Sequence, residues 1–132
     1  MPAKVVDASA LAAILFGEPE AEAMAAALNG AQLIAPRLLP IEIANVCVKK
    51  IKRSPVDQDR LLQALSLYSK LAIELADIDH QRCALAALRS GLTAYDAAYL
   101  LLAKDRGAEL VTLDKDLAAA FSSAREAPIL KT

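Results

Sequence analysis

The stretch LTAYDAAYLLLAKDRGAELVTLDKDL, residues 92–117, predicts a helix, a short strand and the start of a second helix. Thr93 is a typical N-cap for the first helix, and the apolar run at residues 108–113 is typical of a buried strand. Asp96 therefore falls in the first turn of a helix, and Asp114 follows directly behind a strand. Each carboxylate could be an ordinary cap or turn residue, or the two could belong to one site.

The same alternation of strands and helices extends over the rest of the chain. Further apolar strands are predicted at residues 3–6, 31–36 and 72–78, with a fifth option at 127–130. Helical patterns rich in alanine and leucine separate them, at residues 8–18, 19–30, 38–53, 54–71 and 79–91. Helices that alternate with short apolar strands predict an α/β fold, in which helices cover both faces of a mainly parallel sheet of four to five strands.

The composition is that of one folded domain, which we expect to span residues 1–132. Hydrophobic residues make up 56% of the chain but aromatic residues only 4%, which favours helices packed through small side chains over a sheet sandwich. No apolar run is long enough to cross a bilayer, and the first residues lack the pattern of a signal peptide, so we expect a cytoplasmic protein. A net charge of −1 provides no global attraction for nucleic acid, so such a ligand would need local basic patches or a metal ion.

The cysteine and histidine residues do not point to a site. Cys47 and Cys83 each lie in a helical apolar pattern without metal-ligand spacing, so both are expected to be buried, reduced thiols. His80 is the single histidine and lies at a helix start, away from the acidic residues discussed next. One histidine cannot form the paired acid–base arrangement of a metal-free ribonuclease, and no Ser-His-Asp triad can be assembled around it.

Acidic residues recur where strands end. Asp7 follows the first strand, Glu42 lies one turn into the helix after the second, and Asp114 follows the fourth. Binding crevices of parallel sheets form at the carboxyl ends of their strands, so these side chains and Asp96 could meet at one edge. Carboxylates brought together repel one another and raise one another's pKa values unless a cation binds them. Hard oxygen ligands suit Mg²⁺ or Mn²⁺, so one hypothesis is a divalent-metal site. The simpler hypothesis is that the aspartates are helix caps and that the glutamate is solvated.

Four stretches that contain these acids resemble the signature motifs of PIN-domain nucleases, most closely those of the VapC type, the toxins of bacterial and archaeal toxin–antitoxin pairs. They are VVDASALAAILFGE, LPIEIANV, LTAYDAAYLLLAK and LVTLDKDLAAA, and they occur in the order of the family. The resemblance covers essentially the whole chain. It implies a three-layer α/β/α fold and a metal-dependent endoribonuclease that uses Mg²⁺ or Mn²⁺.

The resemblance also implies the catalytic and metal-binding residues. The acidic quartet of the family falls on Asp7, Glu42, Asp96 and Asp114 of this sequence. Carboxylates of this kind would hold one or two ions that polarise the scissile phosphate of RNA and activate a water molecule, leaving a 5′-phosphate and a 3′-hydroxyl. No position of the quartet is missing, which favours an active enzyme.

Other motif positions are implied to support the quartet. Ser9 and Thr112 match hydroxyl positions that would fix carboxylate rotamers, and Asn45 lies one turn after the glutamate. Asp116 is a second acid near the fourth motif, and could assist the metal or only start a helix. The family often has phenylalanine where this chain has Leu117, a difference in packing.

The family further implies partners: a homodimer, and a VapB-like antitoxin whose C-terminal segment lies in a groove near the acidic site. Helices rich in alanine and leucine independently favour association with another chain. For RNA contact, the densest basic cluster is Lys49, Lys50, Lys52 and Arg53, although a solvated helix end is the preferred explanation of it. Arg37 is nearer to the acidic site in sequence. The side chains of Tyr68, Tyr95 and Tyr99 could stack on bases or belong to the core.

Other classes fit less well. A receiver-type signalling domain needs paired acids after the first strand, and a haloacid dehalogenase needs D-x-D, whereas this stretch reads Asp7-Ala8-Ser9. A PIN-like module that only binds a partner conflicts with the intact quartet. A PIN nuclease of RNA maturation, without an antitoxin, is the remaining alternative.

Overall fold

The centre of the molecule is a parallel sheet. The structure is a computed structural model that describes residues 1–126, and this part of the chain contains four strands. They are β1 (Ala3–Val6), β2 (Gln32–Pro36), β3 (Ile73–Ala76) and β4 (Glu109–Val111), in the order β3-β2-β1-β4. Every neighbouring pair is parallel, as the sequence predicts. The fifth strand considered at 127–130 lies outside the described residues.

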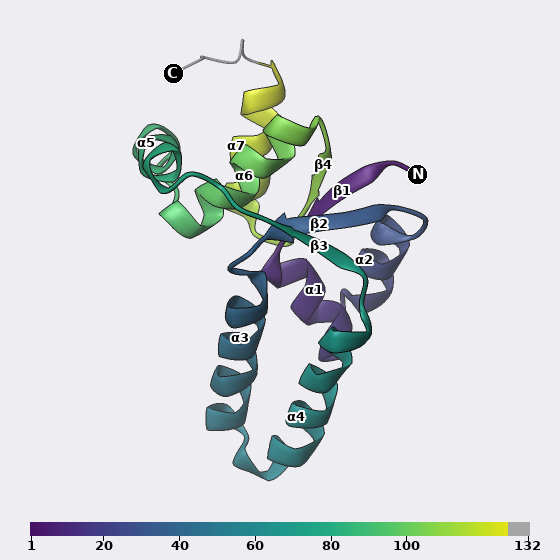
Figure 1. Cartoon of the computed structure of the whole chain (residues 1–132). Helices are drawn as coiled ribbons and strands as arrows, with labels where there is room; N and C mark the ends of the chain where they lie inside the picture. The colour runs from purple at the N-terminus through teal and green to yellow at the C-terminus, as the bar shows by residue number, and fades with distance from the viewer. Residues whose placement is uncertain (127–132) are drawn as a thin grey trace.

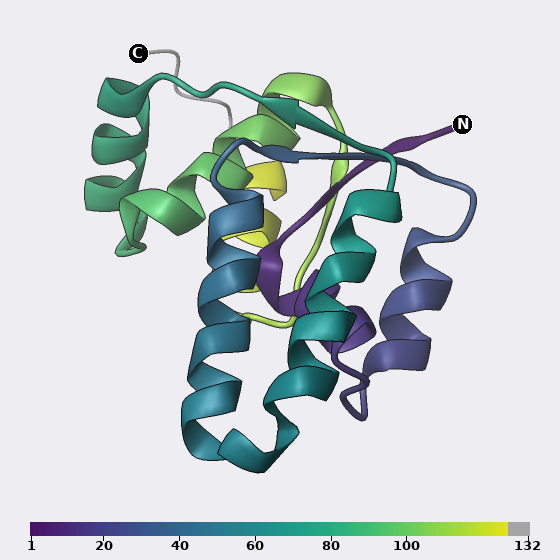
Figure 2. The same cartoon turned by 60° about the horizontal axis from the view of Figure 1, so that its bottom comes forward.

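Helices cover both faces of the sheet. Helices α1 (Ala8–Leu15), α2 (Ala21–Leu28), α3 (Leu39–Arg53) and α4 (Gln58–Ser66) lie on one side. The other side carries α5 (His80–Ser90), α6 (Ala94–Arg106) and α7 (Lys115–Glu126), and the two sets stay separate in the turned view (Figures 1 and 2). The predicted three-layer α/β/α fold is therefore confirmed. In the described part of the chain, no helix has both the length and the apolar character that a membrane crossing requires.

The core is built from aliphatic strand residues and small helix residues. Val5, Val6 and Ile34 of the strands are fully buried, and α1 and α6 pack onto the sheet through several buried alanines. Leu117 is also fully buried, so leucine fills the core position where the family often has phenylalanine. The two cysteines are free and buried, as predicted.

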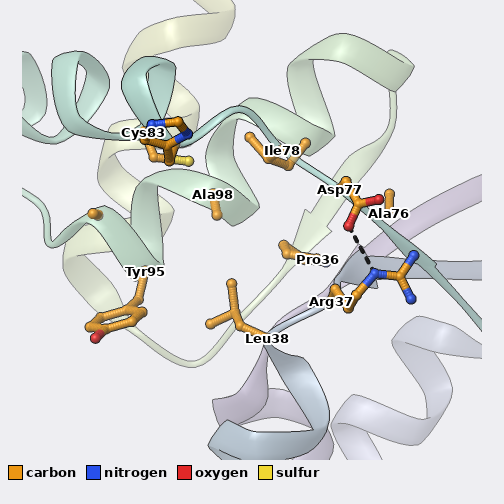
Figure 3. A pocket seen from close by; sticks show the side chains of 11 residues that line it. Pro36, Arg37, Leu38, Ala76, Asp77, Ile78, Cys83, Tyr95 and Ala98 are labelled. Atoms are coloured by element: carbon orange, nitrogen blue, oxygen red, sulfur yellow. Dashed lines mark hydrogen bonds and ion pairs between the residues drawn. The ribbon is translucent and has the colours of Figure 1, made fainter.

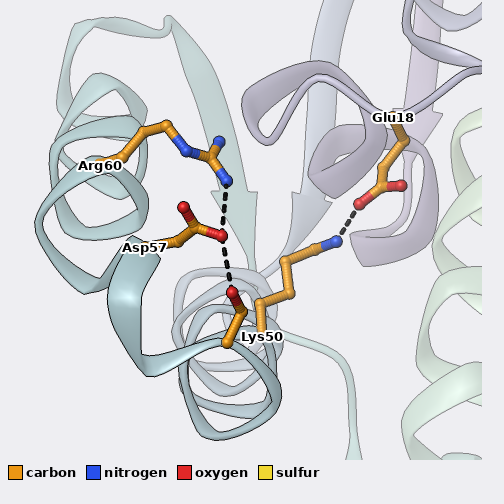
Figure 4. Close-up of polar contacts among 5 residues, drawn as sticks. Glu18, Lys50, Asp57 and Arg60 are labelled. Atoms are coloured by element: carbon orange, nitrogen blue, oxygen red, sulfur yellow. Dashed lines mark hydrogen bonds and ion pairs between the residues drawn. The ribbon is translucent and has the colours of Figure 1, made fainter.

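The helix predicted over residues 54–71 is wrong at both ends. The structure has the 3-10 turn η1 (Pro55–Asp57), then α4, then the 3-10 turn η2 (Leu67–Lys70). The hydroxyl of Ser54 caps no backbone N–H and instead donates to Asp57 Oδ2 at 2.7 Å, and Asp57 also pairs with Arg60 (Figure 4). The backbone N–H of Asp57 donates to the carbonyl of Ser54 at 3.0 Å, which is the i to i+3 pattern of a 3-10 turn.

The strand order places a topological switch beside β1. From β1 the chain moves outward to β2 and β3, and then returns to pair β4 with the other side of β1. In open parallel sheets a crevice forms at the carboxyl ends of the strands where the order reverses. Here the strand order reverses between the end of β1, followed by Asp7, and the end of β4, followed by Thr112.

Candidate active site at the carboxyl edge of the sheet

Asp7 is the buried centre of this edge. It follows β1 directly and is the N-cap of α1, and only 5% of its surface is exposed. Its Oδ1 accepts hydrogen bonds from the backbone N–H of Ala10 at 3.0 Å and from the hydroxyl of Ser9 at 2.8 Å. Its Oδ2 accepts from the hydroxyl of Thr112 at 2.6 Å. A carboxylate has about four lone-pair sites, so one acceptor position on Oδ2 is left for a further ligand.

The same hydroxyls join the loop after β4 to the start of α1. Ser9 Oγ accepts from the backbone N–H of Leu113, and Thr112 Oγ1 accepts from that of Asp114, both at 2.9 Å. The two hydroxyl oxygens lie 3.3 Å apart. Thus Asp7, Ser9, Thr112 and Asp114, which the sequence predicted as site residues, form one connected group.

Glu42 is held from the opposite layer. It projects from the first turn of α3, and its Oε1 accepts a 2.6 Å hydrogen bond from the hydroxyl of Tyr99 on α6. Burial and Glu42 raise the pKa of Tyr99, so its hydroxyl keeps its proton and donates. This contact was not predicted from the sequence. The available signal was spacing, because Tyr99 lies three residues after Asp96 and so on the same face of its helix.

Asp96 lies in the first turn of α6, and Asp114 is the residue before α7. Thr93 caps α6 by accepting from the backbone N–H of Asp96 at 3.1 Å, which leaves the Asp96 carboxylate half-buried. Asp114 Oδ1 accepts from the backbone N–H groups of Asp116 and Leu117. The simple reading of Asp114 as a helix cap is therefore correct for Oδ1, and Oδ2 makes no such contact.

Electrostatics show that the four carboxylates share one field. Burial raises the pKa of Asp7, and the charge of Asp114 raises it further. Burial, followed by Asp96 and Asp7, raises the pKa of Glu42, although the hydrogen bond from Tyr99 opposes this rise. Burial and the charges of Asp114, Asp7 and Asp116 raise the pKa of Asp96. Asp7, Glu42 and Asp96 are therefore each affected by the charge of at least one other acid of the quartet.

Within the described part of the chain, no cationic side chain pairs with these acids. Among the side chains that the structure describes, no lysine, arginine or histidine forms an ion pair with any of the four carboxylates. As the side chains stand in residues 1–126, no three His, Cys, Asp or Glu residues are arranged to hold one ion. Mg²⁺ usually keeps several water ligands and binds proteins through one or two carboxylates. An unbalanced group of hard oxygen donors with a free acceptor on Asp7 fits such a hydrated ion.

The other residues that the sequence predicted are Asn45, Asp116 and the basic cluster 49–53. Asn45 is exposed on α3, and Asp116 is exposed at the start of α7. The basic cluster 49–53 lies at the other end of α3, about 15 Å from Glu42 by helix rise, and its Lys50 pairs with Glu18 (Figure 4).

Among the other groups that could contact RNA, Arg37 pairs with Asp77 at the sheet edge. Tyr99 is a core residue rather than an exposed stacking surface, whereas Tyr95 is 66% exposed.

Comparison with known proteins identifies the fold family. A family model described as the PIN domain matches residues 4–121, which include all four acids of the quartet. This chain belongs to the PIN-domain family. The PIN domain described here is 37% identical over 123 residues to Ribonuclease VapC3 of Pyrobaculum aerophilum, covering 89% of this chain and 93% of that protein. The resemblance to PIN domains of the VapC type, inferred from four motifs, is thereby confirmed.

A solved structure shows the same arrangement of elements. The crystal structure of PAE2754 from Pyrobaculum aerophilum superimposes on this PIN domain with a TM-score of 0.72. The two sequences are 28% identical, and the match covers 90% of this chain and 84% of the other. The sheet and both helical layers are therefore those of a PIN fold.

Proposed function

We propose that this chain is a metal-dependent endoribonuclease and the toxin of a toxin–antitoxin pair. The observation that carries the proposal is the set of four carboxylates at one strand edge, without a cationic partner among the described side chains. Burial and the charges of neighbouring acids raise the pKa values of Asp7, Glu42 and Asp96 there. Similarity to Ribonuclease VapC3 over most of both chains supports RNA as the substrate.

Asp7, Glu42, Asp96 and Asp114 are the proposed catalytic residues and the ligands of Mg²⁺ or Mn²⁺. When bound there, a divalent ion supplies polarisation of the scissile phosphate and a lowered pKa for a nearby water molecule. Asp7 contributes Oδ2, because Oδ1 is already engaged by Ser9 and Ala10. Asp114 contributes Oδ2, because Oδ1 caps α7.

We assign to Glu42 the orientation of the attacking water. The Tyr99 hydroxyl fixes Oε1, and no donor among the described residues bonds to Oε2. In the proposed reaction the water oxygen bonds to phosphorus as the bond from phosphorus to the 3′-oxygen breaks. The 3′-oxygen takes a proton and leaves as a hydroxyl, and the other product carries a 5′-phosphate.

The proposed partners are RNA, a VapB-like antitoxin peptide near the acidic edge and a second copy of this chain. Support for a dimer comes from exposed apolar side chains on two helices. Ile41 and Val48 share one face of α3 and are 74% and 45% exposed, and Leu85 and Leu88 are exposed on α5. Apolar side chains that recur on one face are typical of an interaction surface.

The test is RNA cleavage by purified protein after denaturation and refolding have removed any bound peptide. The substrates are transfer and ribosomal RNA, with Mg²⁺, with Mn²⁺ or with EDTA. We expect cleavage only with a divalent ion, and its loss in Asp7→Asn and Asp96→Asn. Asp59→Asn is the matched control, because Asp59 is exposed on α4 outside the quartet. Cleavage that persists in EDTA and in both quartet variants would contradict the proposal.

A further inference from the structure

A cavity of about 250 Å³ lies at the carboxyl ends of β2 and β3. Pro36 and Ala76 line it where these strands end, and Leu38 lines it just before α3. Tyr95 lines the opposite side, from the first turn of α6, as Figure 3 shows. The cavity therefore lies at the same carboxyl edge of the sheet as the acidic quartet. It lies at the ends of β2 and β3, whereas Asp7 and Asp114 follow β1 and β4.

The sheet register places the cavity level with Asp7. Val5 pairs with Ile34, so the same register continued by two residues sets Asp7 beside Pro36, which itself pairs with Ala76. Neighbouring strands are about 5 Å apart. The cavity therefore begins about one strand spacing from the buried carboxylate. A strand of RNA whose phosphate lay at Asp7 would bring an adjacent nucleotide to this place.

The lining suits a flat, neutral group with polar edges. Leu38, Ile78 and Ala98 supply apolar walls (Figure 3), and Tyr95, whose side chain is exposed, borders the same space. Arg37 and Asp77 line it as an ion pair with 2.8 Å between Nε and Oδ1, so their charges balance. Single-stranded RNA is recognised by splaying out bases, stacking them on aromatic rings and bonding their edges.

We propose that this cavity binds one unstacked nucleobase adjacent to the scissile phosphate, with Tyr95 as its stacking surface. The proposal rests on the proposed ribonuclease function and adds to it a determinant of substrate choice. Tyr95 and Asp96 are consecutive residues of α6, so one turn of helix presents the ring to the base and the carboxylate to the acidic edge. The guanidinium of Arg37 and the imidazole of His80 supply donors for the base edge, and Asp77 supplies acceptors.

The test is an abasic scan of an RNA oligonucleotide that the wild-type protein cleaves at one place. Each nucleotide around the cleaved bond is replaced in turn by an abasic one, and kcat/KM is measured for wild type and for Tyr95→Ala. Removing one stacked base costs roughly ten-fold or more in binding. We expect a loss of that size for wild type at one position next to the cleaved bond. In Tyr95→Ala the same position should cause little further loss, because the ring and the base act as a pair.

Two variants and one binding measurement control the test. Tyr95→Phe keeps the ring and should retain the abasic effect. Val56→Ala removes another exposed apolar side chain, from η1 and outside the cavity lining, and should behave as wild type. Quenching of 2-aminopurine at the coupled position, measured in EDTA without cleavage, should occur with wild type and Tyr95→Phe and be absent with Tyr95→Ala.

Three results would overturn the inference. In the first, wild type cleaves RNA but no abasic position is coupled to Tyr95, which leaves the proposed function intact. In the second, Tyr95→Ala cleaves normally but is inhibited less by an antitoxin peptide, so the cavity takes a side chain of a protein partner. In the third, wild type neither cleaves nor binds any RNA, and the proposed function fails as well.

Discussion

The hydroxyl of Tyr99 donates a 2.6 Å hydrogen bond to Glu42, a residue 57 positions earlier in the sequence. This contact joins α6 on one face of the sheet to α3 on the other, across the acidic edge. Because Tyr99 is buried and keeps its proton, it sets the position of Glu42 without taking part in the chemistry.

Replacing this tyrosine should affect the pH profile as well as stability. In Tyr99→Phe the half-buried Glu42 loses its donor, which should cost about 1–3 kcal/mol of unfolding free energy. The lost hydrogen bond had lowered the pKa of Glu42, so that pKa should rise further, and the acid limb of the cleavage profile should move to higher pH. Cleavage rates from pH 5 to 8 measure this. An unchanged acid limb would mean that Glu42 does not titrate in the reaction.

Thr112 offers a matched pair of variants. Thr112→Val keeps the shape of the side chain but removes the donor to Asp7 and the acceptor for the Asp114 backbone. We expect it to lose about 1–3 kcal/mol of unfolding free energy and most of its cleavage activity, because a buried carboxylate loses a hydrogen bond. Thr112→Ser keeps the hydroxyl and should stay close to wild type in both. Chemical denaturation and initial cleavage rates compare the two, and equal behaviour would refute a role for the hydroxyl.

The quartet should make the metal-free protein less stable as pH rises from acidic to neutral, against the opposite contribution of Asp57 and Asp105, whose hydrogen bonds lower their pKa values. The pKa values of Asp7, Glu42 and Asp96 are raised in the folded state, so the folded chain holds more protons than the unfolded chain above the ordinary carboxyl range. The unfolding free energy therefore falls as pH rises through the raised values. Asp96→Asn removes one of these charges. In EDTA at pH 7.5 its Tm should exceed that of wild type by a few degrees, about 4 °C for each 1 kcal/mol.

Two controls separate this effect from an unrelated change in stability. The gain in Asp96→Asn should shrink below about pH 4, where the wild-type carboxyl is neutral too. Added Mg²⁺ should raise the Tm of wild type more than that of the variant, because only wild type keeps the full donor set. A Tm difference that stays constant from pH 3.5 to 7.5 would contradict repulsion among the quartet as its source.

A charge on the exposed face of α3 should prevent the proposed dimer. Ile41→Lys places a charge where 74% of an apolar side chain is exposed, so the monomer should fold unchanged but fail to associate. Val56→Lys is the matched control, because Val56 is 92% exposed on η1. Sedimentation velocity should give a dimer for wild type and the control and a monomer for Ile41→Lys. A monomeric wild type would argue against the dimer itself.

The fold was accessible from sequence because its signals are local. Apolar strands followed by acids, the cap at Thr93 and the glycines at 91 and 107 that end α5 and α6 in left-handed conformation all lie within short windows. Ser54 shows the limit of such local signals. Its hydroxyl donates to the side chain of Asp57 and therefore does not cap the backbone of a helix.

The candidate site was accessible only in part. Strand-end placement and family motifs indicated the quartet, and the structure brings those residues to one edge. The bond between Tyr99 and Glu42 and the cavity beside Tyr95 each depend on segments packed together across the fold. Such long-range contacts follow from how the layers meet, and no local pattern of residue types encodes them.

The bond between Thr112 and Asp7 joins residues 105 positions apart, and it has a consequence for synthesis on the ribosome. β1 emerges early but receives its neighbour β4 only after more than a hundred residues have been translated. The catalytic group we propose therefore cannot be complete in a nascent chain until Asp114 has emerged. An inhibitor made nearby at the same time could therefore reach the nascent chain during most of its translation. It would arrive before the proposed cleavage of RNA could begin.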